Sequence, residues 1–156
     1  ACEFDDLQKC SREQIVNAYD NALLYTDHVL ASLVAKLKAA SGTLDSAMLF
    51  VSDHGESLGE NNLYLHGLPY SIAPDVQKHV PWITWLSSAM QSRNGTTTPC
   101  LQKELAEQRI THDNYFHSVL GLLDVKTGAY QPELDIFSAC RKTVAAKQAA
   151  PAPAKS

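Results

Sequence analysis

The stretch "AMLFVSDHGESLGENNLYLHG" (residues 47–67) joins an apolar run to a loop rich in carboxylate and imidazole side chains. Its first part, Ala47 to Ser52, is a short apolar run bounded by polar residues, which predicts a strand buried on both faces. In open α/β sheets, ligands bind beyond the carboxyl ends of strands. Asp53 and His54 fall at that end, so their position already indicates a functional loop.

A long helix is predicted before this strand. The sequence "SREQ" (residues 11–14) has the form of a capping box, in which Ser11 and Gln14 satisfy each other's backbone amides. Apolar residues then recur at helical spacing up to about Ala40: Ile15, Tyr19, Leu23, Leu30, Leu33 and Leu37. A helix followed directly by a buried strand indicates an α/β fold. We therefore expect one amphipathic helix with a single buried stripe.

Downstream, "HVPWITWLS" (residues 79–87) predicts a second buried strand, with Pro81 at its start, where a missing N–H is tolerated. We expect residues 92–100, "SRNGTTTPC", to form a surface loop. A short helix is expected over residues 101–108.

The segment "THDNYFHSVLGLLDV" (residues 111–125) predicts a further helix. Its expected inward side chains are Tyr115, Val119, Leu122 and Leu123. Residues 142–156 lack large apolar side chains and end in alternating Ala and Pro, which predicts a disordered tail after a domain of residues 1–141.

The bulk composition excludes several classes. The chain has 156 residues, of which 45% are hydrophobic and 19% charged, as in a single globular domain or a piece of a larger one. The net charge is −4 and no basic block exceeds two residues, which argues against nucleic acid as a partner. No apolar stretch is long enough to span a bilayer. Because "ACEFDDLQKC" lacks an initiator Met and signal-peptide features, we interpret the chain as a segment without its N-terminal portion.

Four cysteines are present, and their spacing fits no zinc ribbon or CxxC redox motif. Cys2 and Cys10 lie in a polar loop that a disulfide could close, and Cys100 and Cys140 both have turn-like neighbours. We favour two disulfides, Cys2–Cys10 and Cys100–Cys140, which would indicate an oxidising compartment. The alternative is four unpaired, partly buried thiols.

Asp53 and His54 are candidate metal ligands, because a carboxylate oxygen with a neutral imidazole suits zinc. Gly55 has no Cβ, so it permits the turn and the close backbone approach that would direct both side chains to one ion. Two ligands do not complete a zinc site, so at least one or two more must come from elsewhere. In the alternative interpretation, the Asp caps a helix and the His is exposed.

His66 lies in the same loop, just before Gly67, and is a candidate metal ligand or a donor to a phosphoryl oxygen. Glu56 and Glu60 could take part in acid–base chemistry or contact the residues that hold the metal, but a solvated surface role is favoured for each. We expect the remaining histidines to be surface or packing residues: His28, His79, His112 and His117.

The stretch "SDHGESLGENNLYLHGLPYSIAPDVQKHVP" (residues 52–81) closely resembles the lipid A phosphoethanolamine transferases, including the mobile colistin-resistance enzymes. "YDNALLYTD" (residues 19–27) and "CEFDDLQKC" (residues 2–10) resemble the helix and the short disulfide loop that precede this motif in the family. The likeness covers Cys2 to Leu86 well and the remainder loosely. The combination "DHGESLGE…YLHG" is far more specific than Asp-His-Gly alone.

This resemblance implies the C-terminal portion of an alkaline-phosphatase-like or sulfatase-like α/β/α sandwich, on the periplasmic face of the inner membrane and tethered by absent N-terminal membrane helices. Such enzymes use zinc and a threonine nucleophile to carry phosphoethanolamine from phosphatidylethanolamine to lipid A. By position, Asp53 and His54 match the zinc-ligand pair of the family. His66 matches the histidine that contacts the transferred phosphoryl group or a second zinc.

The family's nucleophilic threonine, a glutamate ligand and another histidine lie upstream of Ala1, and no motif makes Thr26, Thr84 or Thr111 the nucleophile. We therefore expect the chain alone to be inactive and to need the upstream part of the enzyme. The alternatives are another superfamily member (a phosphoglycerol transferase, phosphodiesterase or sulfatase) and a non-catalytic metal-binding module. The wording of "ESLGENNLYLHGLPY" argues against a generic sulfatase.

Overall fold

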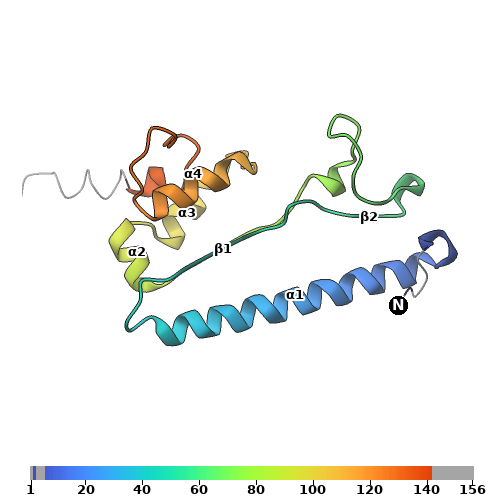
Figure 1. Cartoon of the computed structure of the whole chain (residues 1–156), viewed down its shortest axis with the longest axis horizontal. Coiled ribbons are helices and arrows are strands. Elements are labelled where there is room, and N and C mark those ends of the chain that lie inside the picture. Colours follow the sequence, from blue (N-terminus) through green and yellow to red (C-terminus); the bar gives the residue numbers. More distant parts are fainter. Residues whose placement is uncertain (1, 3–5, 142–156) are drawn as a thin grey trace, which may run out of the picture. The chain divides into compact units, whose positions relative to one another are not determined.

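The structure, a computed structural model, describes Cys2 and residues 6–141 (Figure 1). The chain forms two compact units that divide between Trp85 and Leu86. The tail predicted for residues 142–156 lies outside the described residues. In the part of the chain that the structure covers, no helix combines the length and the apolarity that crossing a membrane requires.

The first unit begins with the short 3-10 helix η1 (Leu7–Lys9) and the long helix α1 (Arg12–Ala40). The predicted capping box is present: the Gln14 N–H donates to Ser11 Oγ at 3.2 Å, and the Ser11 N–H donates to Gln14 Oε1 at 2.9 Å. The Cys2–Cys10 disulfide closes the loop before α1, with its Cα atoms 5.7 Å apart. Both features follow the sequence expectation.

The expectation of a single buried stripe along α1 is wrong for most of the length of this helix. Ile15 is the buried residue of this helix, whereas Leu23 and Leu33 are 48% and 42% exposed. A helix of 29 residues is about 44 Å long. The five-residue strands of the same unit span only about 17 Å, so this sheet is too short to cover the stripe.

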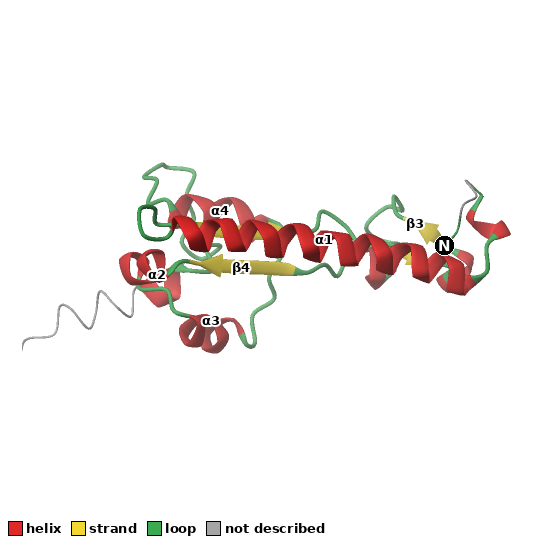
Figure 2. Ribbon diagram, turned by 90° about the horizontal axis from the view of Figure 1, so that it is seen from below, coloured by secondary structure: helices red, strands yellow, loops and turns green. Residues whose placement is uncertain are grey.

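The predicted strands are β1 (Ala47–Val51) and β4 (Trp82–Leu86; Figure 2). They pair in a two-stranded sheet. The Ser52 N–H donates to the Pro81 carbonyl at 3.3 Å, so the end of β1 meets the beginning of β4 and the strands run antiparallel. Burial on both faces is wrong, because Met48 is the buried residue of β1 and Ile83 of β4 is 43% exposed. Burial of both faces of a sheet needs a layer of structure on either side, and two paired strands cannot provide these layers for each other.

Between β1 and β4 the chain forms a small antiparallel hairpin of β2 (Ser57–Leu58) and β3 (Tyr64–Leu65). Ser57 pairs with Leu65, and Leu58 with Tyr64. The 3-10 helix η2 (Glu60–Asn62) makes the turn, and Gly59 before it has a φ of 108°. A further 3-10 helix, η3 (Asp75–Gln77), leads back to β4.

The second unit contains α2 (Ser88–Asn94), α3 (Thr98–Leu105) and α4 (Asp113–Leu122). The surface loop expected at residues 92–100 is wrong, because its ends belong to α2 and α3. Ser87 caps α2 and Gly95, with a φ of 65°, ends it; Thr97 caps α3. These caps are local sequence signals, but the composition of the stretch led to the expectation of a loop. For the same reason, α3 begins and ends three residues earlier than the helix that we expected over residues 101–108.

The inward face of α4 also differs from the expectation: its buried residues are Asn114, His117, Ser118 and Leu122. Of the side chains expected inward, Leu122 is buried as predicted, whereas Leu123 is 62% exposed. The polar side chains on the buried face bind the segment that follows α4. His117 Nδ1 accepts from the Gln131 N–H at 3.1 Å, and Ser118 Oγ accepts from the Ile136 N–H at 3.1 Å. A buried polar group is tolerated when it is hydrogen-bonded, so these side chains of α4 can lie in the interior.

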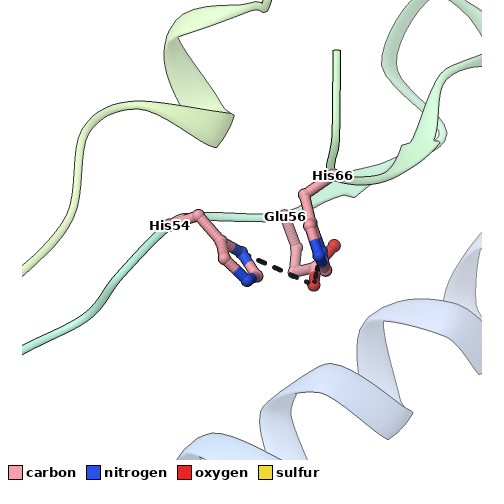
Figure 3. Close-up of side chains that lie close together, drawn as sticks. All are labelled: His54, Glu56 and His66. Atoms are coloured by element: carbon pink, nitrogen blue, oxygen red, sulfur yellow. Dashed lines mark hydrogen bonds and ion pairs between the residues drawn. The ribbon is translucent and has the colours of Figure 1, made fainter. Parts of the chain in front are cut away.

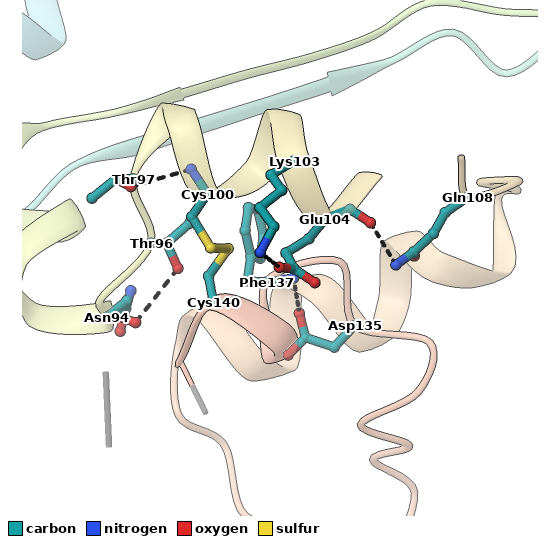
Figure 4. Close-up of a disulfide and its surroundings, with 10 residues drawn as sticks. All are labelled: Asn94, Thr96, Thr97, Cys100, Lys103, Glu104, Gln108, Asp135, Phe137 and Cys140. Atoms are coloured by element: carbon teal, nitrogen blue, oxygen red, sulfur yellow. Dashed lines mark hydrogen bonds and ion pairs between the residues drawn. A yellow bond between two sulfur atoms is a disulfide. The ribbon is translucent and has the colours of Figure 1, made fainter. Parts of the chain in front are cut away.

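The Cys100–Cys140 disulfide ties α3 to the end of this segment (Figure 4). Beside it, Phe137 and Thr96 are fully buried. Arg141 forms an ion pair with the buried Asp135, which also accepts a hydrogen bond from the Tyr130 hydroxyl at 2.6 Å. These contacts close the core of the second unit.

Candidate functional site

Asp53 and His54 follow β1 directly, and their side chains lie close together. Asp53 Oδ1 accepts the His54 N–H at 3.0 Å, and Asp53 Oδ2 lies 3.6 Å from His54 Nε2. The Asp53 side chain is 87% exposed and that of His54 37%. Both predicted ligands therefore present their polar atoms on one accessible side of the loop.

This pair fits a zinc ion. Tetrahedral zinc with ligands at about 2.0–2.1 Å places two ligand atoms about 3.3 Å apart, close to the 3.6 Å between Asp53 Oδ2 and His54 Nε2. His54 Nδ1 lies 3.1 Å from the Gly55 carbonyl oxygen. A proton on Nδ1 would donate to that carbonyl and leave the Nε2 lone pair for a metal, as metal-binding histidines commonly do.

A second group of polar atoms adjoins this pair. His54, Glu56 and His66 each offer a ligand atom, and these atoms lie within 4.8 Å of one another (Figure 3). His66 Nδ1 is 2.8 Å from Glu56 Oε1, while His54 Nδ1 is 4.0 Å from the same oxygen. The two imidazole rings stack with their centroids 3.5 Å apart. The donor set, two imidazoles and a carboxylate, is of the kind that holds a divalent metal.

The hairpin explains why Glu56 and His66, ten residues apart, meet. Ser57 pairs with Leu65 across β2 and β3, so Glu56 and His66 directly flank the last pair of this antiparallel ladder. Residues beside a paired position are brought close together in space. The register of the two short strands thus explains the contact between Glu56 and His66.

Glu56 is the residue that the sequence interpretation misplaced. It was expected to be solvated, yet its side chain is only 25% exposed. Its Oε2 atom is buried and has no hydrogen-bond partner within the described part of the chain. A buried carboxylate oxygen without a partner is costly unless a proton or cation approaches it, so this atom supports a cation-binding site.

Glu60, in contrast, stabilises the hairpin and does not join the cluster. Its Oε2 accepts the Leu58 N–H at 2.7 Å. Hydrogen bonds from the backbone amides of Glu60 itself and of Leu58 lower the pKa of this carboxyl group below its ordinary value. Glu60 therefore serves as a local backbone acceptor.

Gly55 is the point where the site loop contacts the chain that follows it. A Cβ atom at this position would lie 2.0 Å from the Val76 carbonyl oxygen, and the Gly55 N–H donates to the Gln77 carbonyl at 3.1 Å. The close backbone approach expected at Gly55 is confirmed. Gln77 itself had no signal in the sequence.

The three threonines considered as nucleophiles have local structural contacts. Thr26 Oγ1 donates to the Ala22 carbonyl one turn earlier in α1, and Thr84 Oγ1 accepts from the indole N–H of Trp82. The Thr111 N–H donates to Asn114 Oδ1 at the start of α4. All three contacts are of the kind found at helix and strand positions without catalytic function.

Comparison with known proteins places this site in context. A model of the sulfatase family matches residues 2–125. The chain is 46% identical over 141 residues to phosphoethanolamine transferase EptA of Salmonella typhimurium, covering 90% of this chain and 26% of that protein. It is 44% identical over 127 residues to phosphatidylethanolamine transferase Mcr-2 of Escherichia coli, covering 81% and 22%.

Solved structures agree in fold. The soluble domain of lipooligosaccharide phosphoethanolamine transferase A from Neisseria meningitidis matches with a TM-score of 0.85 and 44% identity, over 90% of this chain and 42% of that one. The integral membrane protein of the same name gives the same TM-score and identity, over 90% of this chain and 26% of that one. The predicted sulfatase-like α/β fold is confirmed.

The chain spans about a quarter of the length of the curated relatives it matches. Within that quarter lie Asp53, His54, Glu56 and His66. The match over residues 2–125 and the fold lead to one conclusion. The chain belongs to the sulfatase family, and its relatives in that family are phosphoethanolamine transferases.

Proposed function

We propose that this chain is the C-terminal portion of the catalytic domain of a zinc-dependent transferase that moves phosphoethanolamine from phosphatidylethanolamine to lipid A. The observation that carries the proposal is the site loop: Asp53 Oδ2 and His54 Nε2 lie at a spacing suited to one zinc ion, beside the Glu56–His66 pair. The names of the relatives indicate the transferred group. They favour it over phosphoglycerol transfer and over phosphodiester or sulfate-ester hydrolysis.

Asp53 and His54 would hold the zinc ion together with ligands from the upstream part of the same enzyme. When bound, the ion supplies positive charge that offsets the phosphoryl oxygens and lowers the pKa of a hydroxyl nucleophile. Both side chains retain open access, which a shared site requires.

His66 would contact the transferred group. Glu56 Oε1 lies at hydrogen-bond distance from His66 Nδ1, so the carboxylate orients the ring by accepting its Nδ1 proton. When the imidazole carries both protons, its Nε2–H is left to donate to a phosphoryl oxygen. Glu56 therefore positions His66, and its buried Oε2 adds negative charge beside the cation.

The reaction would proceed in two displacements at phosphorus. An upstream threonine oxygen bonds to the phosphorus of phosphatidylethanolamine, and the bond to the diacylglycerol oxygen breaks, with that oxygen taking a proton. A lipid A phosphate oxygen then bonds to the same phosphorus and releases the threonine. In this proposal the threonine and the membrane helices belong to the upstream part of the enzyme, so we expect this chain to be inactive alone. The complete enzyme would work at the periplasmic face of the inner membrane, in line with the integral membrane relative.

The test uses the complete enzyme with phosphatidylethanolamine and lipid A. We expect mass spectrometry to find phosphoethanolamine on one upstream threonine when the acceptor is left out, and on lipid A when it is present. Transfer of phosphoglycerol, or release of sulfate or phosphate alone, would reject the assignment. Zinc analysis of the same preparation reports the metal separately from turnover.

A further inference from the structure

Gln77, at the end of η3, contacts the site loop at three places. Its backbone carbonyl accepts the Gly55 N–H at 3.1 Å. Its side-chain Nε2 donates to Ser57 Oγ at 2.8 Å and to the Leu65 carbonyl at 3.1 Å. Gln77 is only 6% exposed, so these bonds are shielded from water.

The orientation of this amide follows from chemistry. A backbone carbonyl accepts hydrogen bonds and cannot donate, so the nitrogen of Gln77 must face Leu65. Ser57 and Leu65 are opposite one another in the hairpin. One amide group therefore bridges β2 and β3 at the position next to Glu56 and His66.

Leu65 has an unusual backbone. Its φ is 60°, in the left-handed region that non-glycine residues rarely adopt. Its side chain is 55% exposed, so burial of that side chain does not impose the conformation. Strained backbone of this kind persists only where surrounding contacts hold it, and the carbonyl of Leu65 is held by Gln77.

We propose that Gln77 is a positioning residue for His66. By holding the Leu65 carbonyl, its amide keeps Leu65 in the left-handed conformation, which sets the direction of the next side chain and places the His66 ring against Glu56. Relaxation of Leu65 to an extended φ would turn His66 away. The inference rests on the proposed function, in which His66 contacts the transferred group.

The principal variant is Gln77→Met in the complete enzyme, since Met has a similar length but no donor. We expect kcat to fall about 10- to 100-fold, as when an outer contact that orients an active-site residue is lost, with KM and zinc content unchanged. Gln91→Met is the matched control. Gln91 Nε2 also donates to a backbone carbonyl, that of Leu86 at 3.1 Å, but in the second unit, and we expect its kcat to stay within twofold of wild type.

A second substitution separates positioning from general stability. Asn tolerates the left-handed region, as Asn61 and Asn62 of the same hairpin do with φ of 52° and 61°. Adding Leu65→Asn to Gln77→Met should therefore restore kcat at least about tenfold. A residue that only stabilised the fold would not be rescued in this way.

Hydrogen exchange provides a measurement that does not depend on turnover. We expect faster exchange at residues 63–68 in Gln77→Met, unchanged exchange in α4, and recovery at 63–68 in the double variant. If Gln77→Met cannot be purified, Gln77→Glu replaces it, because its carboxylate can accept from Ser57 but cannot donate to Leu65.

Wild-type kcat in Gln77→Met, or a loss that Leu65→Asn does not restore, would overturn the positioning role. If the wild-type enzyme transfers no phosphoethanolamine, the proposed function fails instead. The exchange data then decide this inference alone: altered exchange at 63–68 that Leu65→Asn reverses supports it, and unchanged exchange rejects it.

Discussion

Oδ2 of Asp53 lies 3.6 Å from Nε2 of His54, although the two residues are neighbours in the chain. Side chains of neighbouring residues in an extended strand point to opposite faces. Because β1 ends at Val51, the backbone is free to turn, and the two polar atoms converge. That convergence is what makes a shared cation possible.

Replacing Asp53 with Asn should weaken zinc binding while leaving the fold intact. The substitution keeps the shape of the side chain but removes its negative charge, which a zinc ligand of this type requires. We expect zinc affinity of the complete enzyme to fall by at least about tenfold, measured by competition with a chelator. Asp27→Asn, at an exposed position of α1, is the control. Equal affinity in Asp53→Asn and wild type would remove Asp53 from the ligand set.

His66→Ala should slow turnover more than it weakens metal retention. The substitution removes the donor that we assign to the phosphoryl group and leaves Asp53 and His54 in place. We expect kcat to fall about 100- to 1,000-fold, as on loss of one donor to a developing negative charge, with zinc content near that of wild type. His28→Ala, on the exposed surface of α1, serves as the control. Activity near wild type would exclude His66 from the site.

Gly55→Ala should destabilise the protein. The added Cβ would lie 2.0 Å from the Val76 carbonyl oxygen, a backbone atom that no rotamer change can move. Overpacking of this kind costs about 1–3 kcal/mol, visible as a lower Tm or urea midpoint of the complete enzyme. At Gly42, an added Cβ meets nothing within 4 Å, so Gly42→Ala should be close to neutral. Equal stability of the two variants would contradict the close approach.

The two disulfides should contribute unequally to stability. Their cysteines are separated by 8 residues in Cys2–Cys10 and by 40 in Cys100–Cys140. In the chain-entropy account, closing the longer loop contributes about 4 kcal/mol and the shorter about 2.5 kcal/mol. Double Ser variants of each pair, compared by urea denaturation, test this order. A larger loss from the Cys2–Cys10 pair would show that strain or residual structure outweighs loop length.

Glu60 should make stability depend on pH in the acidic range. Hydrogen bonds from its own amide and from that of Leu58 lower the pKa of its carboxyl group from the ordinary value of 4.5. The unfolded chain then binds more protons than the folded one near that value. The stabilisation is therefore full above about pH 4.5 and is lost as pH falls through the folded pKa. Glu60→Gln should flatten this part of the stability profile, whereas Glu107→Gln, at an exposed position, should not.

Elements that depend on local signals could be predicted from the sequence. The Ser11–Gln14 capping box placed the start of α1, because both of its hydrogen bonds lie within four residues. The apolar runs placed β1 and β4 to within a few residues. Sequence position identified Asp53 and His54 as residues at the end of β1 and His66 as a further candidate in the same loop. In each case the interacting groups are close in the chain.

Contacts that depend on long-range pairing could not be predicted. Glu56 meets His66 because of the β2–β3 register, and Gln77 reaches Ser57 from twenty residues away. The inward face of α4 is determined by polar groups whose hydrogen-bond partners follow in residues 131–136. Periodicity in hydrophobicity carries no information about which polar groups will satisfy each other.

The amino-acid sequence alone therefore determined the family motif and the loop that holds the candidate site residues, since both are written in residues close together in the chain. Only the tertiary structure decided that Glu56 joins His54 and His66 and that Gln77 holds the hairpin beside them. The physical reason is that a buried polar atom must find its hydrogen-bond partner in space, and that partner is set by how strands register and not by which residues are neighbours in the chain.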